Sequence, residues 1–325
     1  MVPRAVTHLP EGSTPIDYRA TTGDIRLVGL LLDAIKQRWA GALGGPPTPG
    51  SPLARDLAEA SRFATRRLPD PVSQAWTFSQ TLGLVATNHE MILRESLLNY
   101  ANAPVIETLP ITVVTTMARV VLEALSIQAW LIDPSSDGRG RFARWMCLEF
   151  QSELEAWKTL HPGTGYMSSP IIQRLIADAE ALGMDRGRGA SPKWIGAPHP
   201  TSTDLAGDLL RKYPTYSTTG AREMGSIGER FYRLFSSEIH GTVGSVLLLL
   251  LPNSDAAGES RVHVYNLSHG ALWRAAAMVL MSTFVARCVY AEWLGFPVDP
   301  ETRRVHQHHI ELAGRKLLRL GILPT

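Results

Sequence analysis

The chain has 325 residues, of which 45% are hydrophobic and 19% are charged, and this apolar content excludes a disordered protein. Lys and Arg number 32 against 30 Asp and Glu, which excludes a strongly basic nucleic-acid coat and an acidic tail protein. The only cysteines, Cys147 and Cys288, lie within apolar helical patterns and exclude a disulfide framework or a cysteine-based zinc site.

Residues 1–22 contain three prolines and no hydrophobic period, and this pattern predicts an extended or disordered arm. The arm lacks the apolar region of a secretory signal, so we expect a cytoplasmic protein. Three later stretches are apolar, namely 111–132, 246–251 and 275–286, but none reaches about 18 uninterrupted apolar residues. We therefore expect core segments of a soluble protein and no membrane partner.

Apolar residues recur at helical spacing through most of the chain, and Pro and Gly residues mark where the helices end. The first predicted helix begins near Asp24, and the others span about 52–67, 72–100, 111–132, 140–160, 170–182, 203–212, 223–240, 269–294 and 300–320. Only 243–267 shows a strand signal, which predicts at most one small β-hairpin. The predicted architecture is therefore an all-α bundle of about nine or ten helices.

Residues 183–200 contain four Gly and three Pro, which predicts a loop. The loop separates an N-terminal helical part, 23–182, from a C-terminal helical part, 201–325, which carries the Arg–His segment described below. The alternative is that the loop crosses a single core and marks no domain boundary.

Several catalytic and metal-binding motifs are absent from the sequence. The chain has no Walker-type phosphate loop, no H-E-x-x-H or Glu-x-x-His, no D-D-x-x-D and no G-x-S-x-G elbow. His306, His308 and His309 lack a carboxylate at a recognised metal spacing, so we interpret them as part of a solvated basic face. We expect no metal and no cofactor.

The predicted helix 111–132 is apolar except for Gln128 and one narrow polar stripe. The residues of the stripe follow a helical spacing and are Thr112, Thr115, Thr116, Arg119, Glu123 and Ser126. Such a helix is mostly buried, so the stripe faces a partner helix or a cavity. Arg119 and Glu123 lie four residues apart and can pair. One interpretation is a buried ion pair that fixes helix register, and the other is a cation that Arg119 presents to an anionic ligand.

The segment 229–242, ERFYRLFSSEIHGT, places polar residues opposite an apolar face. Arg233 and His240 share one side of this helix, and Ser236 and Ser237 lie between them. A His acts as acid or base near neutral pH, and an Arg holds a phosphate through its planar fork. Together they suit hydrolysis or transfer at a phosphodiester. The alternative is a surface Arg and a His that caps the end of the helix.

An Arg and a His separated by six residues, on an all-helical background, resemble the R-x4-6-H signature of the HEPN superfamily. The resemblance implies a metal-independent ribonuclease of a toxin–antitoxin or antiphage system, with RNA as partner. It implies that Arg233 and His240 act on the RNA phosphate at a homodimer interface. Leu234 departs from the pattern, because the residue after this Arg is often polar in the superfamily.

Much of the chain also resembles uncharacterised helical proteins of high-GC actinobacteria. The matching stretches are 118–134, 141–145 and 231–242. This broader resemblance implies the helical fold and carries no known activity.

Three functions therefore remain open on the sequence alone. The first is a HEPN-like ribonuclease or RNA-binding toxin or defence protein, to which local basic patches at 211–233 and 301–325 would contribute phosphate contacts. The second is a non-catalytic helical scaffold or regulatory protein in which 229–242 is buried. The third is a small-molecule enzyme or binder with a pocket between helices near Arg119 and Glu123. The exposure of 229–242 and the surroundings of Arg119 discriminate among them.

Overall fold

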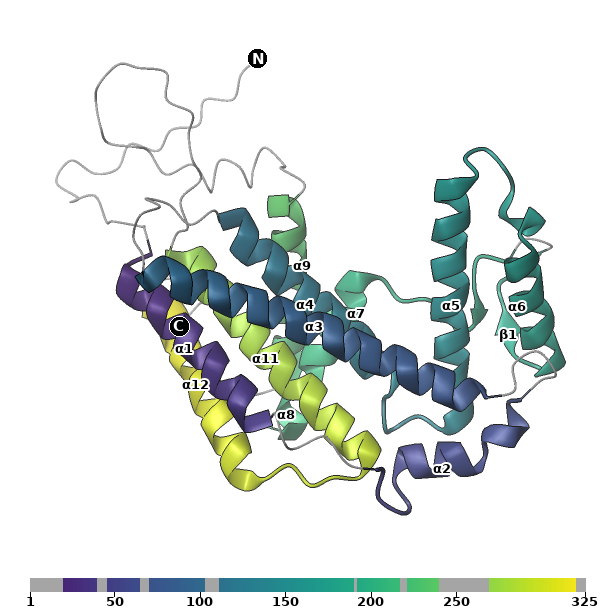
Figure 1. Cartoon of the computed structure of the whole chain (residues 1–325), viewed down its shortest axis with the longest axis horizontal. Coiled ribbons are helices and arrows are strands. Elements are labelled where there is room, and N and C mark those ends of the chain that lie inside the picture. Colours follow the sequence, from purple (N-terminus) through teal and green to yellow (C-terminus); the bar gives the residue numbers. More distant parts are fainter. Residues whose placement is uncertain are drawn as a thin grey trace.

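Helices form almost all of the regular structure, and the prediction of an all-α bundle is confirmed (Figure 1). The computed structural model describes residues 20–39, 46–64, 70–102, 111–189, 192–216, 221–239 and 269–319. His240, the predicted hairpin at 243–267 and most of the predicted arm lie outside the described residues.

The helices begin and end close to the predicted positions. In chain order they are α1 (Thr22–Trp39), α2 (Pro52–Ala58), α3 (Pro71–Asn102), α4 (Ile111–Leu131), α5 (Gly138–Leu160), α6 (Pro170–Ala181), α7 (Ser202–Arg211), α8 (Tyr213–Tyr216), α9 (Ala221–Ile239), α11 (His269–Leu294) and α12 (Pro300–Arg319). The helix predicted at 52–67 is shorter than expected, because α2 is followed by a 3-10 turn, η1 (Ala60–Arg62). A second 3-10 turn, η2 (Tyr166–Ser168), precedes α6.

A small antiparallel hairpin lies within the predicted loop 183–200. It pairs β1 (Asp185–Arg186) with β2 (Ile195–Gly196), and Asp185 stands opposite Gly196 in the register. The hairpin packs on α5 and α6. The Gly196 backbone has a φ of 74° and approaches Ala143 of α5 so closely that a Cβ at this position would clash with the Ala143 carbonyl.

Local sequence explains where several helices begin. Ser51 and Ser169 accept hydrogen bonds from the first turns of α2 and α6, and a proline follows each serine at the start of the helix. Asp137 caps α5 in the same way. At the start of α7, Thr201 and Asp204 form a capping box.

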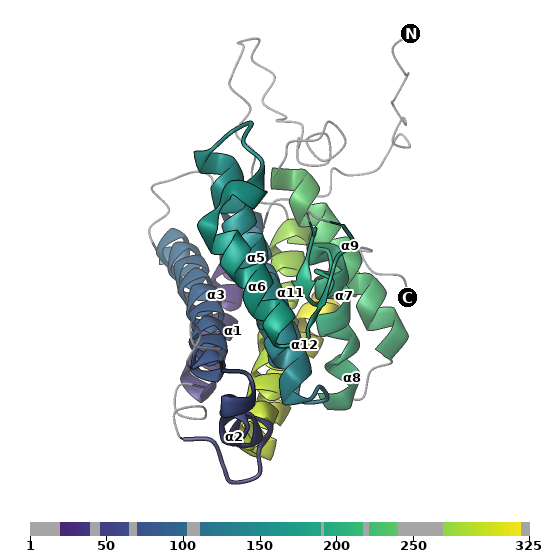
Figure 2. The same cartoon turned by 90° about the vertical axis from the view of Figure 1, so that its right-hand side faces the viewer.

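Two central helices, α4 and α11, divide the bundle into layers. On one side α1 packs on α3 and α3 packs on α4, and on the other side α7 and α9 pack on each other and on α4 (Figure 2). Almost all of the side chains along α11 are buried, and α12 covers another of its faces. The prediction that these two helices are central and buried is confirmed. One hydrophobic cluster includes residues from both sides of the loop 183–200.

By length and composition alone, Val113–Leu131 of α4 and the whole of α11 are long and apolar enough to cross a membrane. Both helices contain charged residues, so the expectation that no stretch has about 18 uninterrupted apolar residues still holds. In α11, 89% of the apolar window is buried inside the protein, and in α4 56% is buried. Buried core helices of this kind meet the same criterion, so the finding decides nothing about a membrane.

Candidate functional site

α9 carries the arginine of the predicted Arg–His pair. Phe231 and Phe235 bury one face of the helix, whereas Arg230 and Arg233 are exposed. The Arg233 side chain is 71% exposed, and its Nη2 lies 4.0 Å from Oε2 of Glu229, one turn earlier. The helix therefore presents the Arg233 guanidinium to solvent, and Glu229 is its one ion-pair partner among the described residues.

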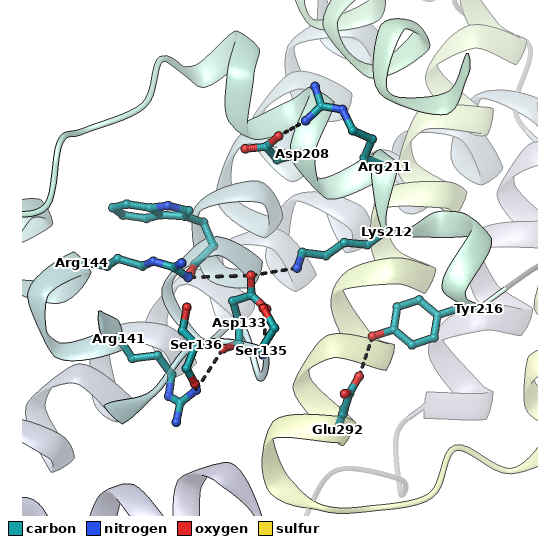
Figure 3. Close-up of polar contacts among 11 residues, drawn as sticks. Asp133, Ser135, Ser136, Arg141, Arg144, Asp208, Arg211, Lys212, Tyr216 and Glu292 are labelled. Carbon is teal, nitrogen blue, oxygen red and sulfur yellow. Dashed lines mark hydrogen bonds and ion pairs between the residues drawn. The ribbon is translucent and has the colours of Figure 1, made fainter. Parts of the chain in front are cut away.

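Glu229 also joins α9 to α7 through a surface network of ion pairs. Its Oε1 lies 3.3 Å from Nη2 of Arg211, and Arg211 in turn pairs with Asp208 (Figure 3). Hydrogen bonds from Thr201 hold the pKa of Asp204 below its ordinary value, with smaller contributions from the charges of Arg211 and Arg233. Exposed pairs of this kind contribute about 0–1 kcal/mol each to the free energy of unfolding. The network therefore orients these side chains but stabilises the fold little.

The described residues contain only part of the predicted Arg–His site. Ser236 lies half-buried on α9, three residues after Arg233. Ser237 also belongs to α9, and His240 lies outside the described residues. The geometry between Arg233 and His240 therefore stays a prediction.

Arg119 and Glu123 lie on the side of α4 that faces α7 and α9. Arg119 Nε is 3.9 Å from Glu123 Oε2, and the two side chains are 20% and 34% exposed. Tyr232 of α9 completes the cluster, because the Arg119 guanidinium lies over its ring, 5.4 Å from the centroid, and Arg119 Nη2 donates to its hydroxyl at 3.3 Å. Glu123 Oε1 accepts hydrogen bonds from the hydroxyls of Ser202 at 2.9 Å and Tyr232 at 3.4 Å.

These contacts correct one expectation about the polar stripe of α4. The pair is half-buried, not buried, and Glu123 is shared among three partners from three helices. The protein itself occupies the guanidinium of Arg119 with a carboxylate and a tyrosine ring. The arrangement favours the structural interpretation of the stripe over a cation presented to a ligand.

A polar cluster that the sequence analysis did not single out surrounds Asp133, just after α4 (Figure 3). Lys212 Nζ donates to Asp133 Oδ2 at 2.9 Å, and Arg144 Nη1 lies 3.9 Å from the same oxygen. Ser135 donates to Oδ1 through its backbone N–H and its hydroxyl. Burial alone would raise the pKa of Asp133, but hydrogen bonds from Lys212 and Ser135 hold this pKa below its ordinary value. Asp133 is therefore a fixed anion between two cations.

Arg144 lies on the other side of this cluster, against Trp130 of α4. Its guanidinium is 5.5 Å from the centroid of the Trp130 ring, and burial lowers the pKa of Arg144. The Trp130 ring also makes an edge contact with His199, and burial lowers the pKa of His199. Arg144, together with Arg139, lines a pocket of about 340 Å³ between the start of α5 and the β1–β2 hairpin.

Arg141 is the most deeply buried cation of this region. Its Nε and Nη2 each lie 2.7 Å from a carboxylate oxygen of Asp56, and the two side chains are 7% and 9% exposed. Arg141 Nη1 donates to the backbone carbonyls of Asp133 and Ser136 (Figure 3). The guanidinium thus ties α2 and the turn between α4 and α5 to α5 itself.

The sequence analysis included Asp133, Arg141 and Arg144 only within the stretches 118–134 and 141–145 of a resemblance that stays a prediction. Their partners Asp56 and Lys212 come from distant helices, and no spacing along the chain pairs them.

The described residues contain no group of three or more His, Cys, Asp or Glu that could hold a metal ion. The interpretation of the histidines near the C-terminus as a solvated face is wrong for His306. This side chain is 2% exposed, and its Nε2 donates to the Leu280 carbonyl at 2.9 Å. Burial, with a smaller contribution from the charge of Arg287, lowers the pKa of His306 well below its ordinary value. Cys147 and Cys288 are both free and buried, and burial raises the pKa of each to about 12.

Comparisons with protein-family models, with curated proteins and with solved structures found no match to this chain.

Proposed function

We propose that the protein acts on RNA through the solvent-facing side of α9, as a HEPN-like metal-independent ribonuclease or RNA-binding toxin or defence protein. The observation that supports this most directly is the exposure of Arg233, whose guanidinium has one ion-pair partner in the described part of the chain, at 4.0 Å. A phosphate offers two oxygens to the planar fork and can replace Glu229 at little cost. Arg211 and Arg230 add exposed cations to the same region of the surface.

In the proposed reaction, Arg233 holds the phosphate that is cleaved and His240 moves the proton. The 2′-hydroxyl oxygen of the RNA bonds to phosphorus as its proton leaves, and the bond from phosphorus to the 5′-oxygen breaks as that oxygen gains a proton. The products are a cyclic phosphate and a 5′-hydroxyl end. Arg233 stabilises the extra negative charge that gathers on the phosphate oxygens. We also propose that two copies of the chain associate as a homodimer, as the resemblance implies.

A non-catalytic scaffold or regulatory protein is the second candidate. The contacts of Arg119 with Glu123 and Tyr232 support it over a small-molecule pocket near this pair, because these side chains bind one another between α4 and α9. A scaffold role predicts that the loss of Arg233 changes no activity on RNA.

Labelled RNA incubated with purified protein tests the proposal. We expect Arg233→Ala and His240→Ala to abolish cleavage, and Arg233→Lys to restore little of it because Lys lacks the bidentate fork. A matched control is Arg62→Ala, since Arg62 is also exposed, at 72%, beside the carboxylate of Glu59, and lies outside both basic patches. Cleavage should survive EDTA, and binding should weaken as salt rises. No cleavage by the parent protein, or equal cleavage by the parent and the His240→Ala variant, would favour the scaffold.

A further inference from the structure

An apolar groove of about 500 Å³ lies on a different face of α9 from Arg233, between α9, α11 and α12. Ile227 and Phe231 line it from α9, Met281 from α11, and Ile310 and Leu317 from α12. Ligand pockets in proteins typically enclose about 300–1,000 Å³ and are lined mainly by apolar and aromatic side chains. The size and lining of the groove are therefore those of a small-molecule site.

Gly314 lines the same groove and lies in the interior of α12. Glycine destabilises the interior of a helix relative to alanine, so its presence at position 314 needs an explanation. Among the described residues, nothing lies within 4 Å of the position that a Cβ would occupy at Gly314. Close packing of the protein therefore does not explain this glycine, whereas the room that it leaves in the groove does.

The polar residues of the groove give the chemistry of its occupant. Arg315 and Glu311 are exposed at the groove, one turn apart on α12. The last turn of the helix adds Lys316 and Arg319, so positive charge prevails at this end. Lys316 is bound by Asp24 at 3.0 Å, whereas neither Arg315 nor Glu311 forms an ion pair within the described part of the chain.

We propose that the groove binds a small amphipathic molecule with an apolar chain or ring system and a single anionic group. The apolar part lies among Phe231, Met281 and Leu317, and the anionic group lies against Arg315. Burial of the apolar part supplies most of the affinity, and the exposed Arg315 orients the molecule. This site is separate from the proposed RNA site, and its test does not depend on activity toward RNA.

The probe for the test is anilinonaphthalene sulfonate, an aromatic anion whose fluorescence rises in apolar surroundings. We expect saturable binding with one probe molecule per chain. Gly314→Phe should fill the groove and weaken binding about tenfold or more, because the phenylalanine ring occupies the space that the probe needs. Arg315→Gln should weaken binding about two- to fivefold, the size of an exposed ion pair. Dodecanoate should displace the probe, and dodecylammonium should not.

Gly165→Phe is the matched control, because Gly165 has a φ of −60° and also has nothing within 4 Å of its Cβ position among the described residues. This variant should bind the probe as the parent does, and circular dichroism should show that both phenylalanine variants are folded. Equal binding by the Gly314→Phe variant and the parent would overturn the proposal.

Two other occupants give distinct results. If the parent binds no probe but Leu248→Ser with Leu250→Ser does, the apolar run at 246–251 of this chain occupies the groove, and the proposal is wrong. If binding decreases as protein concentration rises, a second copy of the chain covers the groove, and the proposal is equally wrong. In both cases Gly314→Phe should weaken the probe binding that is observed, which assigns that binding to this groove.

Discussion

Two arginine–carboxylate pairs show how this fold treats the same chemistry in opposite ways. Arg141 binds Asp56 through two contacts of 2.7 Å, and the two side chains are 7% and 9% exposed. Arg233 lies 4.0 Å from Glu229, and these side chains are 71% and 32% exposed. The buried pair is fixed by geometry and by the absence of competing water, whereas the exposed pair competes with water at every moment.

The difference teaches which arginines can serve a ligand. The hydrogen-bonding groups of Arg141 are used by two carboxylate oxygens and two backbone carbonyls. Arg119 is intermediate, at 20% exposed, with a carboxylate and a tyrosine as partners. Arg233 alone of these three keeps most of its guanidinium in solvent. The burial of an arginine side chain therefore indicates better than its residue type whether the guanidinium is available to a ligand.

The largest expected effect on folding comes from breaking the buried pair. Asp56→Ala strands the Arg141 guanidinium without its carboxylate and should lower the free energy of unfolding by about 3–5 kcal/mol. Glu229→Ala is the matched deletion at the exposed pair and should cost less than about 1 kcal/mol. Unfolding in urea, followed by circular dichroism, measures both. Equal midpoints for the two variants would contradict the claim that the buried pair stabilises the fold more than the exposed pair does.

The same contrast between buried and exposed groups should appear in the pH dependence of stability. His306 is buried and its pKa is lowered well below the ordinary value, so the folded protein keeps it neutral. The unfolded chain binds a proton there below about pH 6.5, which the folded protein does not. The contribution of His306 to stability is therefore complete above that pH and is lost as the pH falls toward the folded-state pKa, with a slope of up to about 1.4 kcal/mol per pH unit.

Unfolding free energies measured between about pH 7.5 and pH 5 test this slope. His306→Gln should flatten it, and His308→Gln, at an exposed position on the same helix, should leave it unchanged. The lowered pKa of Asp133 acts in a different window, because stability from a depressed carboxyl pKa is lost only below about pH 4. A slope that survives His306→Gln would assign the effect to another group.

The half-buried pair on α4 should lie between the two extremes. Glu123→Ala removes the acceptor for Ser202 and Tyr232 and the counter-charge of Arg119, but water can reach the gap. We expect a loss of about 1–2 kcal/mol in the free energy of unfolding. Glu123→Gln keeps an acceptor and should cost less. A loss above about 3 kcal/mol would place this pair with Arg141 and Asp56 instead.

The sequence predicted the helices well and their polar partners poorly, for a physical reason. Helical periodicity and the Pro and Gly breaks are local, so the bounds of α4, α5 and α11 agree with the prediction to within a few residues. The β1–β2 hairpin was not predicted, because strands of two residues show no alternation of apolar and polar side chains. The need for a glycine at position 196 comes from its contact with α5, which is distant in the sequence. The four-residue helix α8 was not predicted, because its Pro214 indicates the end of a helix in the sequence.

The same distinction applies to the candidate site. Arg119 and Glu123 were paired correctly from their spacing of four residues on one helix. The pairs of Asp133 with Lys212 and of Asp56 with Arg141 join residues 79 and 85 positions apart, and only the packing of helices brings them together. The burial of His306 likewise depends on the position of α11, because its hydrogen-bond partner is the Leu280 carbonyl of that helix.

The smallest expected effect on folding is at Arg233, and it sharpens the comparison most. Arg233→Ala removes a long exposed side chain whose one ion pair is loose, so the free energy of unfolding should stay within about 0.5 kcal/mol of the parent. A urea titration beside the Arg62→Ala control measures this, since Arg62 is equally exposed. If Arg233 belongs to a functional surface, its loss removes activity on RNA and leaves stability intact, which is the opposite of the result expected at Arg141. A large loss of stability would instead mean that α9 depends on Arg233 for its packing, and the distinction between the two arginines would fail.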